Sequence, residues 1–331
     1  MKVLIVRFSS IGDIVLTSPV VRCVKEQTGA QVHFLTKAAF SPTLRHNPHV
    51  DRLWTINKEV KEIAAALAAE NFTHLIDLHG NLRTLELRQR LYWGHLRRGR
   101  RPPVVSTFDK LNVRKFLLTR LRIDRMPEEV HIVDRYMDAV RTLGVTNDGK
   151  GLDYFTAPGE TVIPPAQHYL AFVIGAAHAT KRLEEGQMIA LCQRIPVPII
   201  LLGGPAEREL GERIAASGGH ITNGCGAYSL NGSADLVRKA AAVVTHDTGL
   251  MHIAAAFGKP IVSVWGNTVP ALGMYPYLPE GPAHVVAEVR GLACRPCSKI
   301  GYAACPRGHF RCMRDQDLAA IARAALLAVE A

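Results

Sequence analysis

The chain alternates short apolar runs with segments of helical periodicity, and this alternation limits the folds that it can adopt. The strands predicted in the first half are Lys2–Val6, Gln31–Thr36, Val50–Ile56 and His74–Leu78, and helices are expected at Ile14–Val24 and Leu82–Tyr92. Strands separated by helices form right-handed units that build a mainly parallel sheet with helices on its faces. The first half is therefore predicted to be a doubly wound α/β domain.

The same alternation restarts after a break. Turn-forming residues are concentrated between Asn147 and Pro165, as is typical of an interdomain linker. The strands predicted beyond it are Tyr169–Ile174, Val197–Leu202, Val243–Thr245 and Pro260–Trp265. An amphipathic helix, Leu318–Val329, ends the pattern and could pack back on the first domain. We expect two doubly wound domains, 1–157 and 158–331, that face a central cleft.

Composition indicates a globular protein. The 331 residues are 48% hydrophobic and 21% charged, and no apolar stretch approaches the length of a membrane span. Arg7 interrupts the only candidate for a signal peptide, so a cytoplasmic location is expected. Seven cysteines in such a chain are expected to be reduced thiols or metal ligands.

The net charge of +11 points to an anionic partner: nucleic acid, an anionic membrane surface or a phosphorylated substrate. Basic residues are concentrated between Arg83 and Arg125, where only Glu86, Asp109 and Asp124 oppose them. A solvated surface explains such a run as well as a binding role does. Aromatic residues are not regularly interleaved with these bases, which argues against a single-stranded nucleic acid.

The turn after the first predicted strand carries Ser9, Ser10, Gly12 and Asp13. Ligands of an open parallel sheet bind at such a point, where a strand ends and a helix begins. A carboxylate is unsuited to phosphate, so Asp13 has two interpretations. It is either a general base for a substrate hydroxyl or an acid that caps the helix.

Two loops of the second domain are suited to an anion. Gly175–Arg182 follows a strand, and it carries a hydroxyl on Thr180 and a positive charge on Lys181. The other loop, Thr245–His252, joins a buried strand to a helix. It carries Asp247, Thr248, Gly249 and His252. A diphosphate can bind at the start of that helix. Asp247 would then contact a sugar hydroxyl or only cap the helix, and His252 would face the ligand or simply pack.

These motifs together resemble the ADP-heptose:lipopolysaccharide heptosyltransferases, glycosyltransferase family 9. The resemblance is carried by Phe8–Ile14, Asp77–Asn81, Lys181-Arg182, Asp247–Ala256, Gly258-Lys259-Pro260 and Trp265-Gly266. It implies a GT-B fold of two Rossmann-like domains, with the acceptor on the first and the nucleotide sugar on the second. The cysteine-rich segment is most similar to the heptosyltransferase II type.

The resemblance also implies a mechanism and partners. Asp13 would deprotonate the acceptor hydroxyl, which attacks the anomeric carbon with inversion, while Lys181 binds the diphosphate and Asp247 the donor. The expected donor is ADP-heptose and the expected acceptor is the anionic lipid A–core at the inner face of the membrane, with peripheral membrane contact. No cofactor is expected for catalysis, and no nucleic acid is expected as a partner. Lys181 directly follows Thr180, where family members have a longer spacer, so the role of Thr180 stays open.

Four cysteines gather near the C-terminus, within residues 294–312. They are Cys294, Cys297, Cys305 and Cys312, with His309 between the last two. Thiols at this density can hold a structural zinc ion, and the resemblance extends to relatives that hold iron with cysteines. A loop of reduced thiols explains the pattern equally well.

Other functions remain open on the sequence alone. A nicotinamide-dependent oxidoreductase needs a G-x-G-x-x-G turn after the first strand, whereas Gly12 stands alone here. A family 9 transferase that acts on a protein or another glycan, and a non-catalytic ADP-sugar-binding protein, are the remaining alternatives.

Overall fold

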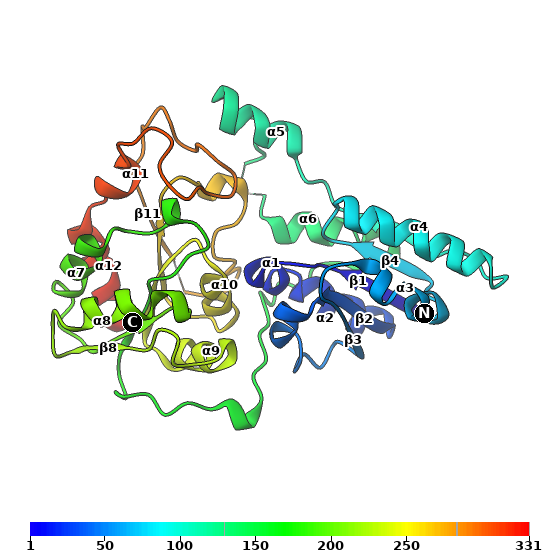
Figure 1. The fold of residues 1–331 in the computed structure, drawn as a ribbon, viewed down its shortest axis with the longest axis horizontal. Helices are drawn as coiled ribbons and strands as arrows, with labels where there is room; N and C mark the ends of the chain where they lie inside the picture. The colour runs from blue at the N-terminus through cyan, green and yellow to red at the C-terminus, as the bar shows by residue number, and fades with distance from the viewer. Residues whose placement is uncertain (129, 283, 331) are drawn as a thin grey trace. The chain divides into compact units, whose positions relative to one another are not determined.

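The computed structural model describes residues 1–128, 130–282 and 284–330. The chain forms two compact units, each built on a parallel sheet (Figure 1). The first unit is Met1–Lys110 with Val130–Phe155, and the second holds the described residues of 111–128 and 156–330. Residues 111–128, which the sequence places well before the linker, thus belong to the second unit.

The sheet of the first unit has the strand order β3-β2-β1-β4-β5, and all its strands run parallel. The strands are β1 (Lys2–Val6), β2 (Gln31–Lys37), β3 (Arg52–Ile56), β4 (His74–Asp77) and β5 (Val104–Thr107). The order reverses between β1 and β4, whose last residues Val6 and Asp77 are paired. In an open α/β sheet, the crevice at such a reversal is the usual ligand site.

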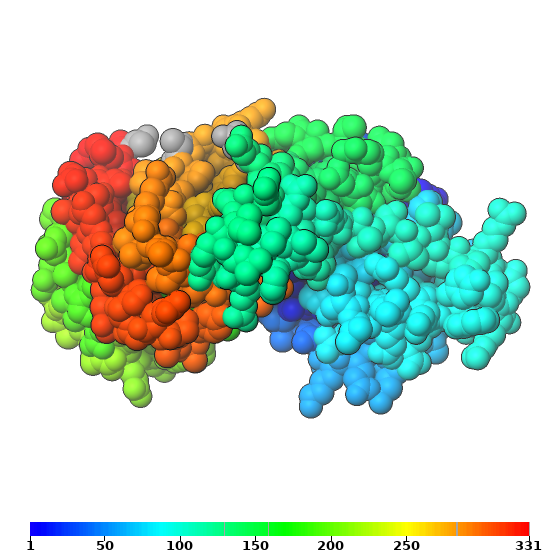
Figure 2. All heavy atoms as spheres, turned by 90° about the horizontal axis from the view of Figure 1, so that it is seen from above, coloured from blue at the N-terminus to red at the C-terminus, as the bar shows by residue number. Residues whose placement is uncertain are grey.

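The helices of the first unit are α1 (Ile11–Val15), α2 (Ser18–Thr28), α3 (Ala64–Ala69), α4 (Leu82–Leu96) and α6 (Ile132–Asp138), with short 3₁₀ segments at Ala38–Thr43, Val60–Glu62 and Arg141–Leu143. The single helix predicted over Ile14–Val24 is wrong, because the chain breaks at Leu16–Thr17 and a new helix starts. Pro19 lies in the first turn of α2, where its missing N–H costs no hydrogen bond. Helix α4 packs on α3 and stands at the outer surface of the unit (Figure 2, cyan).

The sheet of the second unit has the order β11-β10-β9-β6-β7-β8 and is also parallel. The strands are β6 (Leu170–Val173), β7 (Ile199–Leu202), β8 (Ile221–Asn223), β9 (Ala242–His246), β10 (Ile261–Trp265) and β11 (Val285–Glu288). Here the order reverses between β6 and β9, and the two loops suited to an anion follow these two strands. The two doubly wound sheets confirm the predicted α/β class.

The helices of the second unit are α5 (Asn112–Phe116), α7 (Glu185–Cys192), α8 (Arg208–Ala215), α9 (Leu230–Lys239), α10 (Gly249–Ala256), α11 (Arg311–Arg314) and α12 (Leu318–Glu330). A π-helical turn, Leu117–Leu121, follows α5, and 3₁₀ turns lie at Pro158–Glu160, Ala179–Lys181, Pro205–Glu207 and Pro270–Leu272. Within the described chain, no helix is long and apolar enough to cross a membrane.

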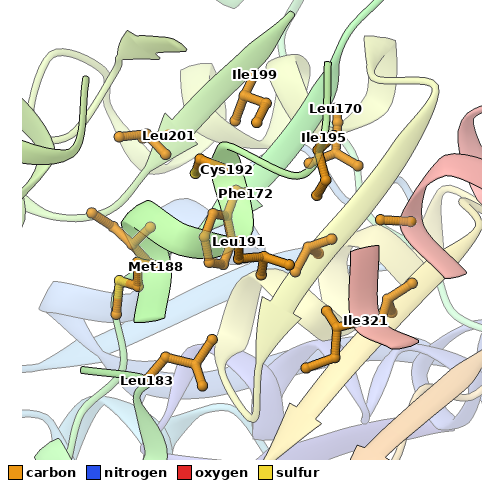
Figure 3. Packing of buried hydrophobic residues seen from close by; sticks show 14 of the residues in the cluster. Leu170, Phe172, Leu183, Met188, Leu191, Cys192, Ile195, Ile199, Leu201 and Ile321 are labelled. Carbon is orange, nitrogen blue, oxygen red and sulfur yellow. The ribbon is translucent and has the colours of Figure 1, made fainter. Parts of the chain in front are cut away.

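The core of the second unit lies between its sheet and the helices α7 and α12. Figure 3 shows Phe172 of β6, Leu191 of α7 and Ile321 of α12 in this cluster. The sequence analysis considered that the final helix could pack on the first domain. In the structure, α12 packs against β9, β10 and α7 of its own unit. Burying an aliphatic or aromatic side chain of this size contributes about 1.5–3 kcal/mol, so α12 is held by its own apolar face.

A buried arginine fastens α2 to the loop that ends the first unit. The guanidinium of Arg22 forms ion pairs with Asp148 and Asp153 and donates to Gly151 O at 2.9 Å. The hydrogen bonds from Arg22 lower the pKa of Asp148 to about 2. Since the ordinary pKa is near 3.9, this pair stabilises the fold fully above about pH 4, and the contribution is lost as the pH falls towards 2.

We predict that Arg22→Leu lowers the free energy of unfolding by about 3 kcal/mol, because it leaves two partly buried carboxylates without their cation. Urea denaturation measures this change. Arg141→Leu is the matched control, since Arg141 and Asp138 are exposed, and it should cost less than about 1 kcal/mol. Equal effects of the two substitutions would contradict the importance of this cluster.

Candidate active site

The turn after β1 is held by Arg7, which the sequence analysis did not count as a site residue. Its Nη1 donates to Leu78 O at 2.6 Å, and its Nε donates to Ser9 O at 2.8 Å. Its Nη2 lies 2.5 Å from Oδ1 of Asp13. One guanidinium therefore joins the turn after β1, the turn after β4 and the first turn of α1.

Asp13 is the third residue of α1 and is partly exposed, at 22% of its side chain. Its Oδ2 accepts hydrogen bonds from the backbone N–H of Ser10 at 3.0 Å and from the Ser10 hydroxyl at 2.8 Å. The helix-capping interpretation is thus confirmed. The role of Asp13 as a base stays a prediction, and so do the acceptor-side roles of Ser9, Ser10 and Gly12.

The surroundings of Asp13 keep it ionised. Burial alone would raise its pKa, but the charge of Arg7 and the hydrogen bonds from Ser10 outweigh burial and hold the pKa below its ordinary value. At neutral pH the group is therefore a carboxylate that can accept a proton.

A histidine lies beside the same turn. The His79 ring makes an edge contact with the Phe8 ring, with centroids 5.3 Å apart. The guanidinium of Arg83 lies over the Phe8 ring, 5.6 Å from its centroid. Burial and the charges of Arg7 and Lys110 lower the pKa of His79 to about 4, so it is neutral at pH 7. Its Nδ1 is buried and has no hydrogen-bond partner among the described residues. His79 is therefore a candidate substrate contact, which the sequence placed in a family motif but not in the site.

In the second unit, the structure brings two predicted donor-binding residues into contact. Lys181 follows β6, Asp247 follows β9, and Nζ of Lys181 lies 2.5 Å from Oδ2 of Asp247. The same oxygen accepts a hydrogen bond from the Thr268 hydroxyl at 2.9 Å. Both side chains are nearly buried, and the charge of each is compensated by the opposite charge of the other.

The helix that follows β9 begins at the predicted position. Thr248 is the N-cap of α10, and its Oγ1 accepts a hydrogen bond from Leu250 N at 3.2 Å. Gly249 is the first helical residue, and His252 is buried one turn later. The partial positive charge of this helix end is located one residue beyond Asp247.

Thr180 is buried, and its hydroxyl serves another part of the chain. It donates to Tyr302 O at 3.1 Å and accepts from Tyr302 N at 2.8 Å. Its hydroxyl proton is thus already used, which favours a role in fixing the loop over direct donor contact. Through this pair, the loop that carries Lys181 is joined to the cysteine-rich segment.

The four C-terminal cysteines converge on one small pocket together with His309. Thr180 and Asn267 also line it. All four are free thiols, and Sγ of Cys294 lies 3.6 Å from Nε2 of His309. Burial raises the pKa of Cys297, and burial raises that of Cys312 to about 11, so both are protonated at neutral pH.

The donor types in this pocket suit zinc or iron, but their arrangement does not form a ligand set. In the ranges that the structure describes, no three His, Cys, Asp or Glu side chains are placed to hold a metal ion. Both polar atoms of the buried Asn267 amide also lack a partner there. A structural metal at Cys294, Cys297, Cys305 and Cys312 therefore stays a prediction.

The comparison with known families decides the class of the protein. The sequence pattern of glycosyltransferase family 9 (heptosyltransferase) matches residues 60–299. The chain belongs to this family. This glycosyltransferase is 27% identical over 299 residues to lipopolysaccharide heptosyltransferase 1 of Escherichia coli K12, covering 82% of this chain and 90% of the relative. It is 36% identical to lipooligosaccharide heptosyltransferase 2 of Haemophilus influenzae over 77 residues, 22% of each chain.

A solved structure confirms the fold. The E. coli ADP-heptose lipopolysaccharide heptosyltransferase II superposes on this glycosyltransferase with a TM-score of 0.68, covering 100% of both chains at 18% identity. The predicted GT-B fold of two Rossmann-like domains is therefore confirmed.

We predict that Arg7→Met raises the pKa of Asp13, because it removes the adjacent positive charge that lowers this pKa. If the ionised carboxylate of Asp13 accepts the proton of the acceptor hydroxyl, the acid limb of the transfer rate should move to higher pH. Arg7→Lys should restore most of the difference. An acid limb that does not move in Arg7→Met would mean that Asp13 does not limit the reaction.

Proposed function

We propose that this glycosyltransferase moves heptose from ADP-heptose to the inner core of lipopolysaccharide, with inversion at the anomeric carbon. Its family membership and the names of its relatives support the transfer and the substrates. The observation that carries the mechanism is the ionised, partly exposed carboxylate of Asp13 at the strand-order reversal of the first sheet.

Asp13 acts as the general base. The acceptor hydroxyl oxygen forms a bond to the anomeric carbon while the bond from that carbon to the diphosphate oxygen breaks. The hydroxyl proton passes to the carboxylate, and ADP leaves with the bonding electron pair. One displacement inverts the configuration. The neutral ring of His79 and the hydroxyls of Ser9 and Ser10 supply further contacts for a sugar acceptor.

Lys181 and the start of α10 stabilise the leaving diphosphate. Lys181 is paired with Asp247. A bound diphosphate supplies a stronger negative charge to Lys181, and Asp247 then accepts hydrogen bonds from donor hydroxyls. The N-terminal N–H groups of α10, beginning at Gly249, face the same anion.

The net charge supports the proposed acceptor and the proposed membrane contact. A net charge of +11 suits the phosphorylated, carboxylate-bearing inner core and an anionic membrane surface. We place the protein in the cytoplasm, in peripheral contact with the inner membrane, with no nucleic acid as a partner.

The four cysteines remain candidate ligands for a structural zinc or iron ion, and no metal is assigned to the chemistry. Elemental analysis of purified protein tests this. A stoichiometric metal that is lost in Cys297→Ser would establish the site, and its absence would leave the cysteines as reduced thiols.

We predict that Asp13→Asn lowers the transfer rate by about 10²–10⁴-fold while leaving the affinity for ADP-heptose unchanged. The assay measures ADP release with Kdo-lipid A and with heptosyl-Kdo-lipid A, and calorimetry measures donor binding. Ser10→Ala, which removes one hydrogen bond to Asp13 but keeps the carboxylate, should lose less than about tenfold. Turnover of wild-type protein with neither acceptor would refute the proposed substrate.

Lys181→Gln should reduce the transfer rate by about 10²–10³-fold and weaken ADP-heptose binding, because one cation at the diphosphate is lost. Arg182→Gln controls for charge in the same loop, since Arg182 pairs with Glu207 instead. If both variants lose equal activity, Lys181 has no specific role at the diphosphate.

A further inference from the structure

Helix α4 presents a second apolar stripe in addition to the one that it buries. Its buried face is formed by Thr84, Leu87, Leu91 and His95, which recur at helical spacing. A mean of 3.6 residues per turn places any other set with this spacing on a different side of the helix.

The second stripe is exposed. It consists of Leu82, Leu85, Tyr92, Trp93 and Leu96, at positions i, i+3, i+10, i+11 and i+14. Leu82 is 84% exposed and Trp93 is 58% exposed. Tyr92 and Trp93 make an edge contact with ring centroids 5.4 Å apart. The clustering of large apolar side chains on one helix face marks an interaction surface rather than scattered exposed residues.

Positive charge surrounds this stripe. Residues 82–101 contain seven arginines and a single acid, Glu86, which pairs with Arg90. Arg97, Arg98 and Arg101, directly after the helix, are exposed. Figure 1 shows that the C-terminal part of α4 extends past the neighbouring strands of its own unit, so these arginines stand at the far end of the helix.

We propose that this face of α4, the five-residue stripe with Arg97, Arg98 and Arg101, lies on an anionic lipid surface. An interfacial helix inserts leucines and aromatic rings at the boundary between headgroups and acyl chains, while arginines along it bind lipid phosphates. Tryptophan and tyrosine are suited to that boundary because each has an apolar ring and a polar atom.

Charge favours lipid over a second copy of the chain. Two copies joined through the stripe would bring their arginine-rich ends or flanks together, with Glu86 as the sole acid in each segment. A nucleic acid would match the charge but would leave the leucines without an apolar partner. An anionic membrane satisfies both halves of the surface.

The lipid-binding surface of α4 would provide the membrane contact of the proposed function, and only its biological role rests on that function. The vesicle measurements below need no heptose transfer, so the surface and the activity can fail separately.

The first test uses the fluorescence of Trp93. The chain has three tryptophans, and both Trp54 and Trp265 are buried. Vesicles of phosphatidylcholine with phosphatidylglycerol should shift the emission to shorter wavelength, and brominated acyl chains should quench it. Phosphatidylcholine alone should give a smaller response. A shift that persists in Trp93→Phe, or no response in the wild type, would overturn the proposal.

The second test measures binding by vesicle flotation. The double variant Leu85→Glu with Trp93→Glu should bind phosphatidylglycerol-containing vesicles roughly tenfold more weakly or worse, because two apolar side chains no longer leave water. Leu327→Glu on α12 is the matched control, since Leu327 is also exposed, and it should bind like the wild type. Unchanged binding of the double variant would refute the lipid surface.

Sedimentation and activity measurements distinguish lipid binding from the other possible roles of the stripe. If the double variant changes self-association or DNA binding but not vesicle binding, the stripe serves a second copy or a nucleic acid, and the proposal is wrong. With a deacylated, water-soluble acceptor, the double variant should keep the wild-type rate, and it should lose rate only with acceptor in vesicles. A wild type that is inactive on both acceptors yet binds vesicles would refute the proposed activity and leave the lipid surface standing.

Discussion

The ion pair between Arg7 and Asp13 is the contact on which the candidate site of the first unit depends. The guanidinium fixes the turns after β1 and β4, and it also sets the charge of Asp13. The same ion pair makes Asp13 less basic, because a carboxylate paired with a cation is a weak base. The mechanism that we propose therefore requires late proton transfer, after bond formation to the anomeric carbon has made the hydroxyl acidic.

The second unit also contains an ion pair at its candidate site, in which the cation is the predicted functional group. The charge of Lys181 is compensated by Asp247, and the Thr268 hydroxyl donates a hydrogen bond to Asp247. The loop that carries Thr268 is fastened by Arg295, which donates to Gly266 O at 2.5 Å and to Thr268 O at 2.9 Å. The cysteine-rich segment thus fixes the loop whose Thr268 hydroxyl contacts Asp247.

Sequence reasoning found the elements whose signal is local. The buried runs of β1, β6 and β9, the turn with Asp13 and the start of α10 lie where predicted. Three strands that were missed, β5, β8 and β11, are sheet edges with short or exposed segments and weak periodicity. Contacts between distant residues were equally invisible: Arg7 was considered only as a break in a signal peptide, and Thr180 gave no sign of its pairing with Tyr302.

The mechanism that we propose is a single displacement assisted by the carboxylate of Asp13. The configuration of the anomeric carbon tests it most directly, by comparing the donor with the purified product in NMR spectra of both. Inversion is the result that one direct attack predicts. Retention would require two successive displacements or a different mechanism, and it would contradict the role assigned to Asp13.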